Sequence, residues 1–600
     1  MAEDLATGLQ RALALLRDAN AEDARRLLCE LADTNPQFAD VWQLLALAEK
    51  QLEDFAAAEA AFLESIRLQP QAHVLTNLGN LYRHQAKHEE ALQQYQRALE
   101  LDQSHVPAEV NRGQSLLALQ RLTAAEESFN RVLQNVPDYL NARVGLAQVL
   151  QQQGRQAEAI DMFQQVLVQQ PANLPALNGM GISLKVLGFA EDAVELLTKA
   201  CHQSPESVEI WVNLASAFAQ ADRDEEAVAA YQRAIALDPL NPELHEWCNG
   251  YLGVIDHPEH LHSYQQALEA EPAAAELAAP YARKLLLLNR ADEALAVLDA
   301  CLRHSSNKAL LLCERSHILR ESGEFPAAVA AARSAFAQDV SSYGSRRELA
   351  TALMASGEAY KEACNLLSQL LTEHPQDQGI LALYATALRY TEAWDEYRRL
   401  IDYQTMVHVR TVVPGMPTDT AVPETWTACL LALHTTNSHP IEQSMVGGTQ
   451  TLDDLFSRAE PELVQLQSAL AEQIRAVLSG LPSLEDHPLY GRNSGNFRFS
   501  DSWSVRLHRQ GFHKNHYHSA GWLSSAYYVR VPDAVDRGGE GWIKFGEPGF
   551  RAREPLPAEY WVKPRAGQLV MFPSYLWHGT EPLVTASERI TIGYDILPGE

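Results

Sequence analysis

Basic residues are scarce in this sequence, and long apolar runs are missing. Among 600 residues, 48 Lys and Arg stand against 77 Asp and Glu, which gives a formal net charge of −29. Such a charge repels phosphate groups, so we expect neither nucleic acid nor an anionic membrane as partner. The first residues, MAEDLATGLQ, are acidic where a signal peptide is basic, and no apolar run reaches the roughly 18 residues of a membrane span. The sequence therefore favours a cytoplasmic protein.

Paired cysteines are also missing. Seven cysteines are scattered along the chain, and none belongs to a Cys-x-x-Cys pair. This spacing predicts neither disulfides nor a zinc site built from cysteine. A chain of this length exceeds one ordinary hydrophobic core, so we expect at least two domains, or a repeat array followed by a domain.

A small residue followed four positions later by a large apolar one recurs every 33 or 34 residues, with one doubled gap. Two antiparallel helices approach closely only where one side chain is small, and stacked pairs then bury a continuous core. The pattern predicts an α-solenoid of about eleven units over residues 1–405. The small residues are Ala58, Ala91, Ala125, Ala159, Ala193, Ala227, Ala294 and Ala328.

These units resemble the tetratricopeptide repeat, most completely in NLGNLYRHQAKHEEALQQYQRALELD, and the resemblance weakens after about residue 240. It implies a concave face that holds an extended protein or peptide segment. Asn77, Asn111 and Asn213 occupy one position of their units, where some family members bind peptide backbone through asparagine. Gly145 and Gly179 interrupt this row. The alternative is that asparagine is simply common at this position.

The composition changes near residue 405, where the 34-residue period ends and prolines and β-branched residues become frequent. We expect a linker over 409–426 and a second domain over 406–600. Helical spacing of apolar residues predicts a supporting helix over 462–481, and about five to eight short strands predict a double-stranded β-helix, or jelly roll. The fold class is thus α+β multidomain, an α-solenoid followed by this domain. The clearest strands are expected over 497–509, 522–532, 541–546, 568–573 and 588–596.

Three histidines lie within six positions in GFHKNHYHSAGWLSSAYYV, residues 511–529. On a strand, residues i and i+2 point to the same side, so His516 and His518 can bind one metal ion together. His513 has the opposite parity and is expected outside the ligand set or against the substrate. A third ligand has to come from a distant strand, and His578 in LVMFPSYLWHGT is the candidate. Arg589 opens the apolar strand ERITIGYDI and offers a planar fork for a carboxylate.

The His-x-His pair, the distal WHGT and the ERIT strand together resemble the Fe(II)- and 2-oxoglutarate-dependent oxygenases. The similarity is strongest to a bacterial, prolyl-hydroxylase-like group that joins tetratricopeptide repeats to this domain. It implies Fe(II) bound by His516, His518 and His578. It also implies 2-oxoglutarate held by Arg589, with Tyr528 on the same cosubstrate. Most of the superfamily has Asp or Glu where this chain has His518, which makes the iron centre more positive by one charge.

The resemblance implies a dioxygenase that decarboxylates 2-oxoglutarate to succinate while it hydroxylates a protein or peptide recruited by the repeats. One alternative is a tetratricopeptide scaffold for protein–protein interaction with a catalytically silent barrel. Others are a hydrolytic zinc site made of the same histidines, and a small-molecule oxygenase whose repeats only oligomerise. Four tryptophans fit either a substrate slot or the core: Trp503, Trp522, Trp542 and Trp577.

Overall fold

Helices fill the first two thirds of the chain, and antiparallel strands dominate the remainder. A computed structural model describes residues 2–412, 422–434, 444–451, 454–458, 460–536, 538–584 and 588–599, so part of the expected linker over 409–426 lies outside the described residues. The predicted fold class, helical repeats followed by a β-rich region, is confirmed. Two compact units, Met1–Asp222 and Arg223–Glu600, make up the chain, and each is described by itself.

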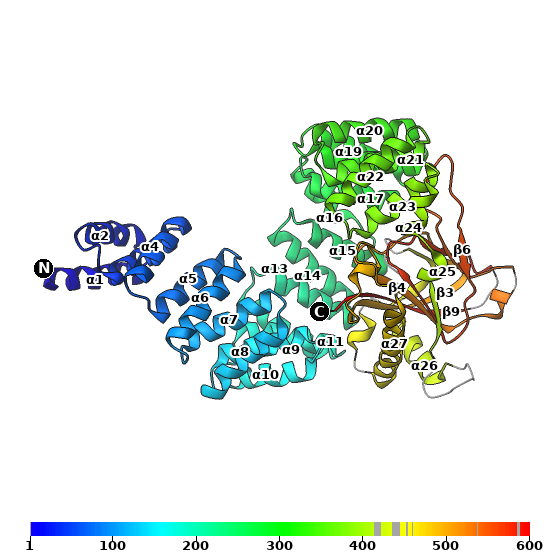
Figure 1. Cartoon of the computed structure of the whole chain (residues 1–600). Coiled ribbons are helices and arrows are strands. Elements are labelled where there is room, and N and C mark those ends of the chain that lie inside the picture. The colour runs from blue at the N-terminus through cyan, green and yellow to red at the C-terminus, as the bar shows by residue number, and fades with distance from the viewer. Residues whose placement is uncertain are drawn as a thin grey trace. The chain divides into compact units, whose positions relative to one another are not determined.

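The first unit is a stack of antiparallel helices, drawn from blue to cyan in Figure 1. Within the described residues the helices up to Leu400 come in twelve successive pairs, against about eleven units expected. The helices of this unit are α1 (Ala2–Arg17), α2 (Ala21–Thr34), α3 (Ala39–Gln51), α4 (Phe55–Leu68), α5 (Ala72–His84), α6 (His88–Leu101), α7 (Val106–Ala118), α8 (Leu122–Asn135), α9 (Leu140–Gln152), α10 (Gln156–Gln169), α11 (Leu174–Val186), α12 (Ala190–Gln203) and α13 (Val208–Gln220).

Glycines in this stack make room for aromatic rings of the neighbouring helix. A Cβ atom on Gly145 would lie 2.4 Å from the ring of Phe129, and one on Gly179 would lie 2.3 Å from the ring of Phe163. Both distances are far below van der Waals contact, so a side chain at either position forces the ring to move. The two glycines that interrupt the asparagine row therefore serve helix packing.

The second unit begins with further helix pairs, and the weakened repeat pattern after residue 240 coincides with the short helix α16. Within the described residues no helix is both long and apolar enough to cross a bilayer. All seven cysteines of the chain are free. The helices are α14 (Asp224–Leu237), α15 (Pro242–Val254), α16 (His262–Ala270), α17 (Ala275–Leu287), α18 (Ala291–Leu302), α19 (Lys308–Ser322), α20 (Phe325–Gln338), α21 (Tyr343–Ser356), α22 (Tyr360–Glu373), α23 (Gln378–Tyr390), α24 (Trp394–Leu400), α25 (Tyr403–Met406), α26 (Glu424–Leu433) and α27 (Pro461–Gly480).

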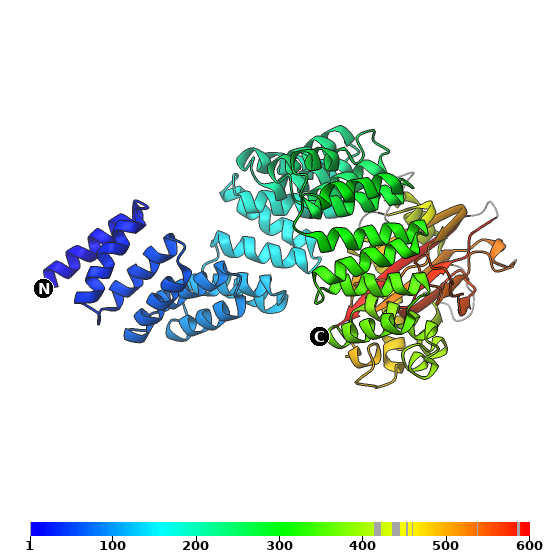
Figure 2. The same cartoon turned by 90° about the horizontal axis from the view of Figure 1, so that it is seen from above.

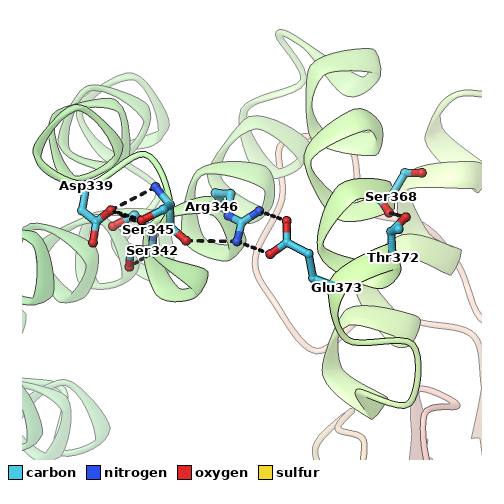
Figure 3. Close-up of polar contacts among 8 residues, drawn as sticks. Asp339, Ser342, Ser345, Arg346, Ser368, Thr372 and Glu373 are labelled. Carbon is cyan, nitrogen blue, oxygen red and sulfur yellow. Dashed lines mark hydrogen bonds and ion pairs between the residues drawn. The ribbon is translucent and has the colours of Figure 1, made fainter.

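Polar contacts join helix α21 to its neighbours. Asp339 accepts hydrogen bonds from the backbone N–H groups of Ser341 and Ser342 at the turn before α21. Arg346, in the first turn of α21, forms two hydrogen bonds of 2.6 Å with the carboxylate of Glu373 in α22 (Figure 3). A bidentate pair of this kind fixes the spacing of the two helices.

The strands form two antiparallel sheets. The larger has the order β1-β7-β4-β9-β3-β2 and the smaller the order β6-β5-β8. The five expected strands correspond to β3, β4, β5, β7 and β9, and the expected supporting helix is α27, whereas the shorter β1, β2, β6 and β8 were not foreseen. The strands are β1 (His408–Thr411), β2 (Met445–Gln450), β3 (Phe497–His513), β4 (Leu523–Arg530), β5 (Ile543–Phe545), β6 (Tyr560–Val562), β7 (Gln568–Pro573), β8 (His578–Thr580) and β9 (Arg589–Pro598).

One hydrophobic core unites the last repeats with the sheets. It runs without a break from Leu381 and Leu388 of α23 to Phe572 of β7. Figure 2 shows the green helices of this unit lying across the orange and red strands. Arg389 reinforces the contact, because its guanidinium donates to the backbone carbonyls of Gly546 and Pro557. The helices α20 to α24 therefore form one wall of the β-rich region.

Candidate metal centre

Three histidine side chains converge in the β-rich region. His516 and His578 exchange two backbone hydrogen bonds, of 2.8 and 2.9 Å, which join the segment after β3 to the start of β8. The Nε2 atoms of His516 and His518 lie 3.1 Å apart, and one ring nitrogen from each of the three histidines falls within 4.8 Å of the others. His516 makes only an isolated bridge rather than a strand, yet the i, i+2 spacing still directs both rings to one point.

Two of the histidines are oriented by backbone carbonyls. The Nδ1 atom of His516 lies 2.8 Å from the carbonyl of Lys514, and that of His578 lies 2.9 Å from the carbonyl of Leu576. A carbonyl only accepts hydrogen bonds, so each Nδ1 carries the proton and each Nε2 presents a lone pair. This is the orientation that metal-binding histidines adopt in proteins.

The third histidine is oriented by a carboxylate. Nδ1 of His518 lies 2.6 Å from Oδ1 of Asp595 in β9, and the hydroxyl of Ser524 donates to the same oxygen at 2.6 Å. Asp595 is only 7% exposed. A buried carboxylate behind a histidine raises its basicity and fixes its tautomer. Sequence reasoning missed Asp595, although its strand parity with Arg589 and Gly593 placed it on one face of a predicted strand.

Burial keeps two of these imidazoles neutral. Desolvation, and next the neighbouring His518, lower the pKa of His516 to about 3. Desolvation, and next His516, also hold the pKa of His578 well below its ordinary value. A neutral imidazole is the form that binds a metal ion. The donor set therefore fits a divalent transition metal at physiological pH.

The same pocket contains a buried cation. The pocket has a volume of about 580 Å³, and Arg589, Tyr528 and Thr591 line it together with the three histidines. Arg589 is 1% exposed, donates to the carbonyl of Gly541 at 2.8 Å, and lies over the ring of Tyr528 at 5.8 Å. Among the described residues no acidic side chain pairs with it, and burial lowers its pKa.

Orphaned polar atoms around this cation indicate a ligand. Nε of Arg589 and Oγ1 of Thr591 are both buried without a hydrogen-bond partner in the described part of the chain. An unpaired buried guanidinium is costly unless an anion binds it, and its planar fork matches a carboxylate. A carboxylate bound in this pocket would satisfy both groups. The residues present therefore fit both the metal and the cosubstrate.

His513 and the four tryptophans differ in whether they line the pocket. His513 lines the pocket but lies outside the three-histidine group, and its Nδ1 lies 3.1 Å from the hydroxyl of Ser444. Of the four tryptophans, only Trp503 lines the pocket. Trp522 is buried in the core, and the indole N–H groups of Trp542 and Trp577 donate elsewhere, to a loop carbonyl and to helix α23 respectively.

The three asparagines of the repeats lie far along the chain from the histidines, in the first unit. Asn77 is half-buried. The amide of Asn111 donates to Oδ1 of Asn80 at 2.8 Å, and that of Asn213 donates to Oδ1 of Asn178 at 3.0 Å. Each of these two amides therefore links successive repeats.

Fold and site together define a helical-repeat protein with a β-rich region that holds three convergent histidines and a buried arginine in one pocket. Residues 501–595 match the family model described as "Putative 2OG-Fe(II) oxygenase". Residues 39–71, 72–105, 110–173 and 178–242 match tetratricopeptide repeat models. The chain thus joins tetratricopeptide repeats to a domain of this oxygenase family, and all three histidines and Arg589 lie inside the matched region.

Several solved structures resemble parts of the chain. A tetratricopeptide repeat protein from Parabacteroides merdae is 17% identical, over 41% of this chain and 98% of its own, with a TM-score of 0.36. PilF of Pseudomonas aeruginosa is 21% identical, over 35% and 95%, with a TM-score of 0.32. YrrB, described as having an unusual peptide-binding site, is 22% identical, over 31% and 96%, with a TM-score of 0.26. A comparison with curated proteins gave no match.

Proposed function

We propose that this protein is an Fe(II)- and 2-oxoglutarate-dependent dioxygenase that hydroxylates a protein or peptide recruited by its repeats. The observation that carries the proposal is the presence of three convergent imidazole nitrogens and the unpaired Arg589 in one pocket. A hydrolytic metal site needs no buried cation beside it. A 2-oxo acid with a second carboxylate needs both a metal ion and a cation, since one end binds the metal and the other binds the guanidinium.

Each residue of the pocket has a distinct task in this proposal. Fe(II) with 2-oxoglutarate supplies the oxidising chemistry when bound. His516 and His578 offer lone pairs on Nε2, because their Nδ1 protons are held by carbonyls. Arg589 and Tyr528 orient the distal carboxylate. The strands that bury these side chains exclude water from the reacting atoms.

An aspartate lies behind the histidine that takes the place of the usual acidic ligand. Nδ1 of His518 lies 2.6 Å from Oδ1 of Asp595, so an acidic side chain stands directly behind the histidine that takes the place of an acidic ligand. Asp595 would then act on a bound metal through His518, from a buried position. This pairing favours an active centre over a barrel that has lost its metal.

One helix of the repeats contributes a residue to the pocket within the second unit. Leu287, at the end of helix α17, lines the pocket together with the residues of the strands. A substrate in this pocket could therefore contact a repeat helix as well as the strands. Tetratricopeptide repeats generally bind proteins or peptides, and an extended segment is the natural occupant of such a surface.

A spectroscopic experiment tests the proposal. Fe(II) and 2-oxoglutarate added to the protein without oxygen should give a weak visible charge-transfer band. His578→Ala should abolish the band, and Arg589→Met should shift its 2-oxoglutarate dependence to much higher concentration. Metal binding without the band would favour the zinc alternative. No metal binding at all would favour the scaffold alternative.

A further inference from the structure

The residue between the two neighbouring histidines is bound to a repeat helix. Tyr517 alternates in direction with His516 and His518, and its hydroxyl accepts a 2.8 Å hydrogen bond from Nη2 of Arg347 in helix α21. Gly379 of helix α23 leaves room for the same ring, because a Cβ at this position would lie only 2.8 Å from the Tyr517 hydroxyl. The side-chain direction of Tyr517 thus fixes that of its two neighbours.

The residue before the third histidine is bound to a repeat helix as well. The indole N–H of Trp577 is shared between Oγ1 of Thr386 at 3.0 Å and the carbonyl of Ala382 at 3.2 Å, both in helix α23. His578 follows directly in the chain. Both segments that carry the histidines are therefore held by side-chain contacts with helices of the last repeats.

An aromatic cluster joins these two anchors. The rings of Tyr517 and Trp577 meet edge to face with centroids 4.9 Å apart, and Phe550 meets Trp577 at 6.2 Å. The guanidinium of Arg320, in helix α19, lies over the ring of Phe550 at 5.7 Å. Edge-to-face and cation–π contacts of this kind add specific geometry to simple burial. Helices α19, α21 and α23 all contribute to the cluster.

We propose that the last repeats are positioning elements of the metal centre, with Arg347, Tyr517 and Trp577 as the positioning residues. The inference rests on the proposed function only in requiring that the three histidines bind a metal ion. Loss of either anchor frees a histidine-bearing segment to turn, and the three Nε2 atoms then no longer converge. Partners that orient ligands from outside commonly change metal affinity by about 10–100-fold.

Binding of Co(II) alone to the full chain tests the inference without reference to catalysis. Tyr517→Phe removes one hydroxyl and Trp577→Phe removes one indole N–H. We expect each variant to bind Co(II) about tenfold more weakly than the wild type and to change the visible ligand-field spectrum. Arg347→Met removes the partner of Tyr517 from the repeat side. Combined with Tyr517→Phe it should cost no more than either change alone, because one shared interaction is lost.

Two matched variants separate positioning from general stability. Arg346→Met, at the adjacent position of α21, breaks the ion pair with Glu373 that Figure 3 shows. Tyr390→Phe breaks a 2.8 Å bond from α23 to the carbonyl of Glu554 at the same repeat–sheet contact. Both should lower thermal stability and leave Co(II) affinity and spectrum unchanged. If Tyr517→Phe and Trp577→Phe bind Co(II) as the wild type does, the inference about the repeats is wrong and the proposed function stands. If the wild type itself binds no Co(II), both the inference and the proposed function are wrong.

Discussion

His518 and Asp595 form a buried histidine–carboxylate pair, with Nδ1 and Oδ1 2.6 Å apart. Asp595 belongs to β9, seventy-seven residues further along the chain, and Ser524 of β4 donates to the same carboxylate oxygen. In the proposed metal centre, this pair places a carboxylate directly behind His518, the histidine that takes the place of the acidic ligand expected from the resemblance.

Asp595→Asn should weaken metal binding by about tenfold, because an amide neither raises the basicity of His518 nor supplies a negative charge. Titration of the metal-free full chain with Co(II) measures this. Asp501→Asn is the matched control, since Asp501 faces Asp595 across β3 and β9 and lines the same pocket without a hydrogen bond to a histidine. Equal effects of the two substitutions would show that overall charge, rather than the pair, sets the affinity.

Arg589→Met should have opposite effects on ligand binding and on stability. It removes charged hydrogen bonds to the cosubstrate, which are worth about 1.5–3 kcal/mol each, so 2-oxoglutarate affinity should fall by at least tenfold. It also removes an unpaired buried cation, so the ligand-free protein should unfold at a higher temperature. Calorimetric titration and thermal unfolding give the two values. Arg530→Met, which loses only partly exposed ion pairs with Glu588 and Glu424, should change neither by a comparable amount.

The repeats could be predicted because their determinants are local. The spacing of small and large residues sets which positions of each helix meet, and Gly179 packs against Phe163 only sixteen positions away. The i, i+2 rule likewise placed His516 and His518 together. His578 and Arg589 were candidates from their own segments, as a ligand on a distant strand and as a cation opening an apolar strand, whereas Tyr528 and the cosubstrate role of Arg589 came from resemblance to known oxygenases. Residues 541–546 were predicted as a strand, but the partner strands β6 and β8 have three residues each and show no alternation.

The supporting contacts of the site could not be predicted from the sequence, because they join residues far apart in the chain. Arg347 and Tyr517 are 170 positions apart, and Thr386 and Trp577 are 191 apart. No local pattern distinguishes Arg347 from Arg346, yet one contacts Tyr517 in the histidine-bearing segment and the other contacts Glu373. Only the packing of the last repeats on the sheets decides which arginine reaches which partner.

Stability should fall as the pH drops from about 6.5 to 4, in part because of His434. Burial, and next Arg506, lower the pKa of His434 to about 4 from its ordinary value of 6.5. The folded protein holds this imidazole neutral between the hydroxyls of Thr449 and Ser504, while the unfolded chain protonates it below pH 6.5. The unfolded state then binds more protons, so unfolding becomes easier as the pH falls through this window.

His434→Gln should flatten this pH dependence, because the amide stays neutral while it can still bond to the neighbouring hydroxyls. Denaturant unfolding of the metal-free protein at several pH values between 4 and 7 measures the slope. The difference between wild type and variant isolates His434 from the other buried histidines. A slope that His434→Gln leaves unchanged would assign the pH dependence to other groups.

Glycine-to-alanine substitutions in two repeat helices should change stability in opposite directions. At Gly179 the added Cβ would lie 2.3 Å from the ring of Phe163, so Gly179→Ala should destabilise the first unit by about 1–3 kcal/mol. At Gly250, inside helix α15, no atom lies within 4 Å of the added Cβ, so Gly250→Ala should stabilise the helix by up to about 1 kcal/mol. Phe163→Leu should recover part of the loss at Gly179 by shortening the clashing side chain. Denaturant unfolding followed by circular dichroism gives these differences, and a Gly179→Ala protein as stable as the wild type would contradict the predicted ring contact.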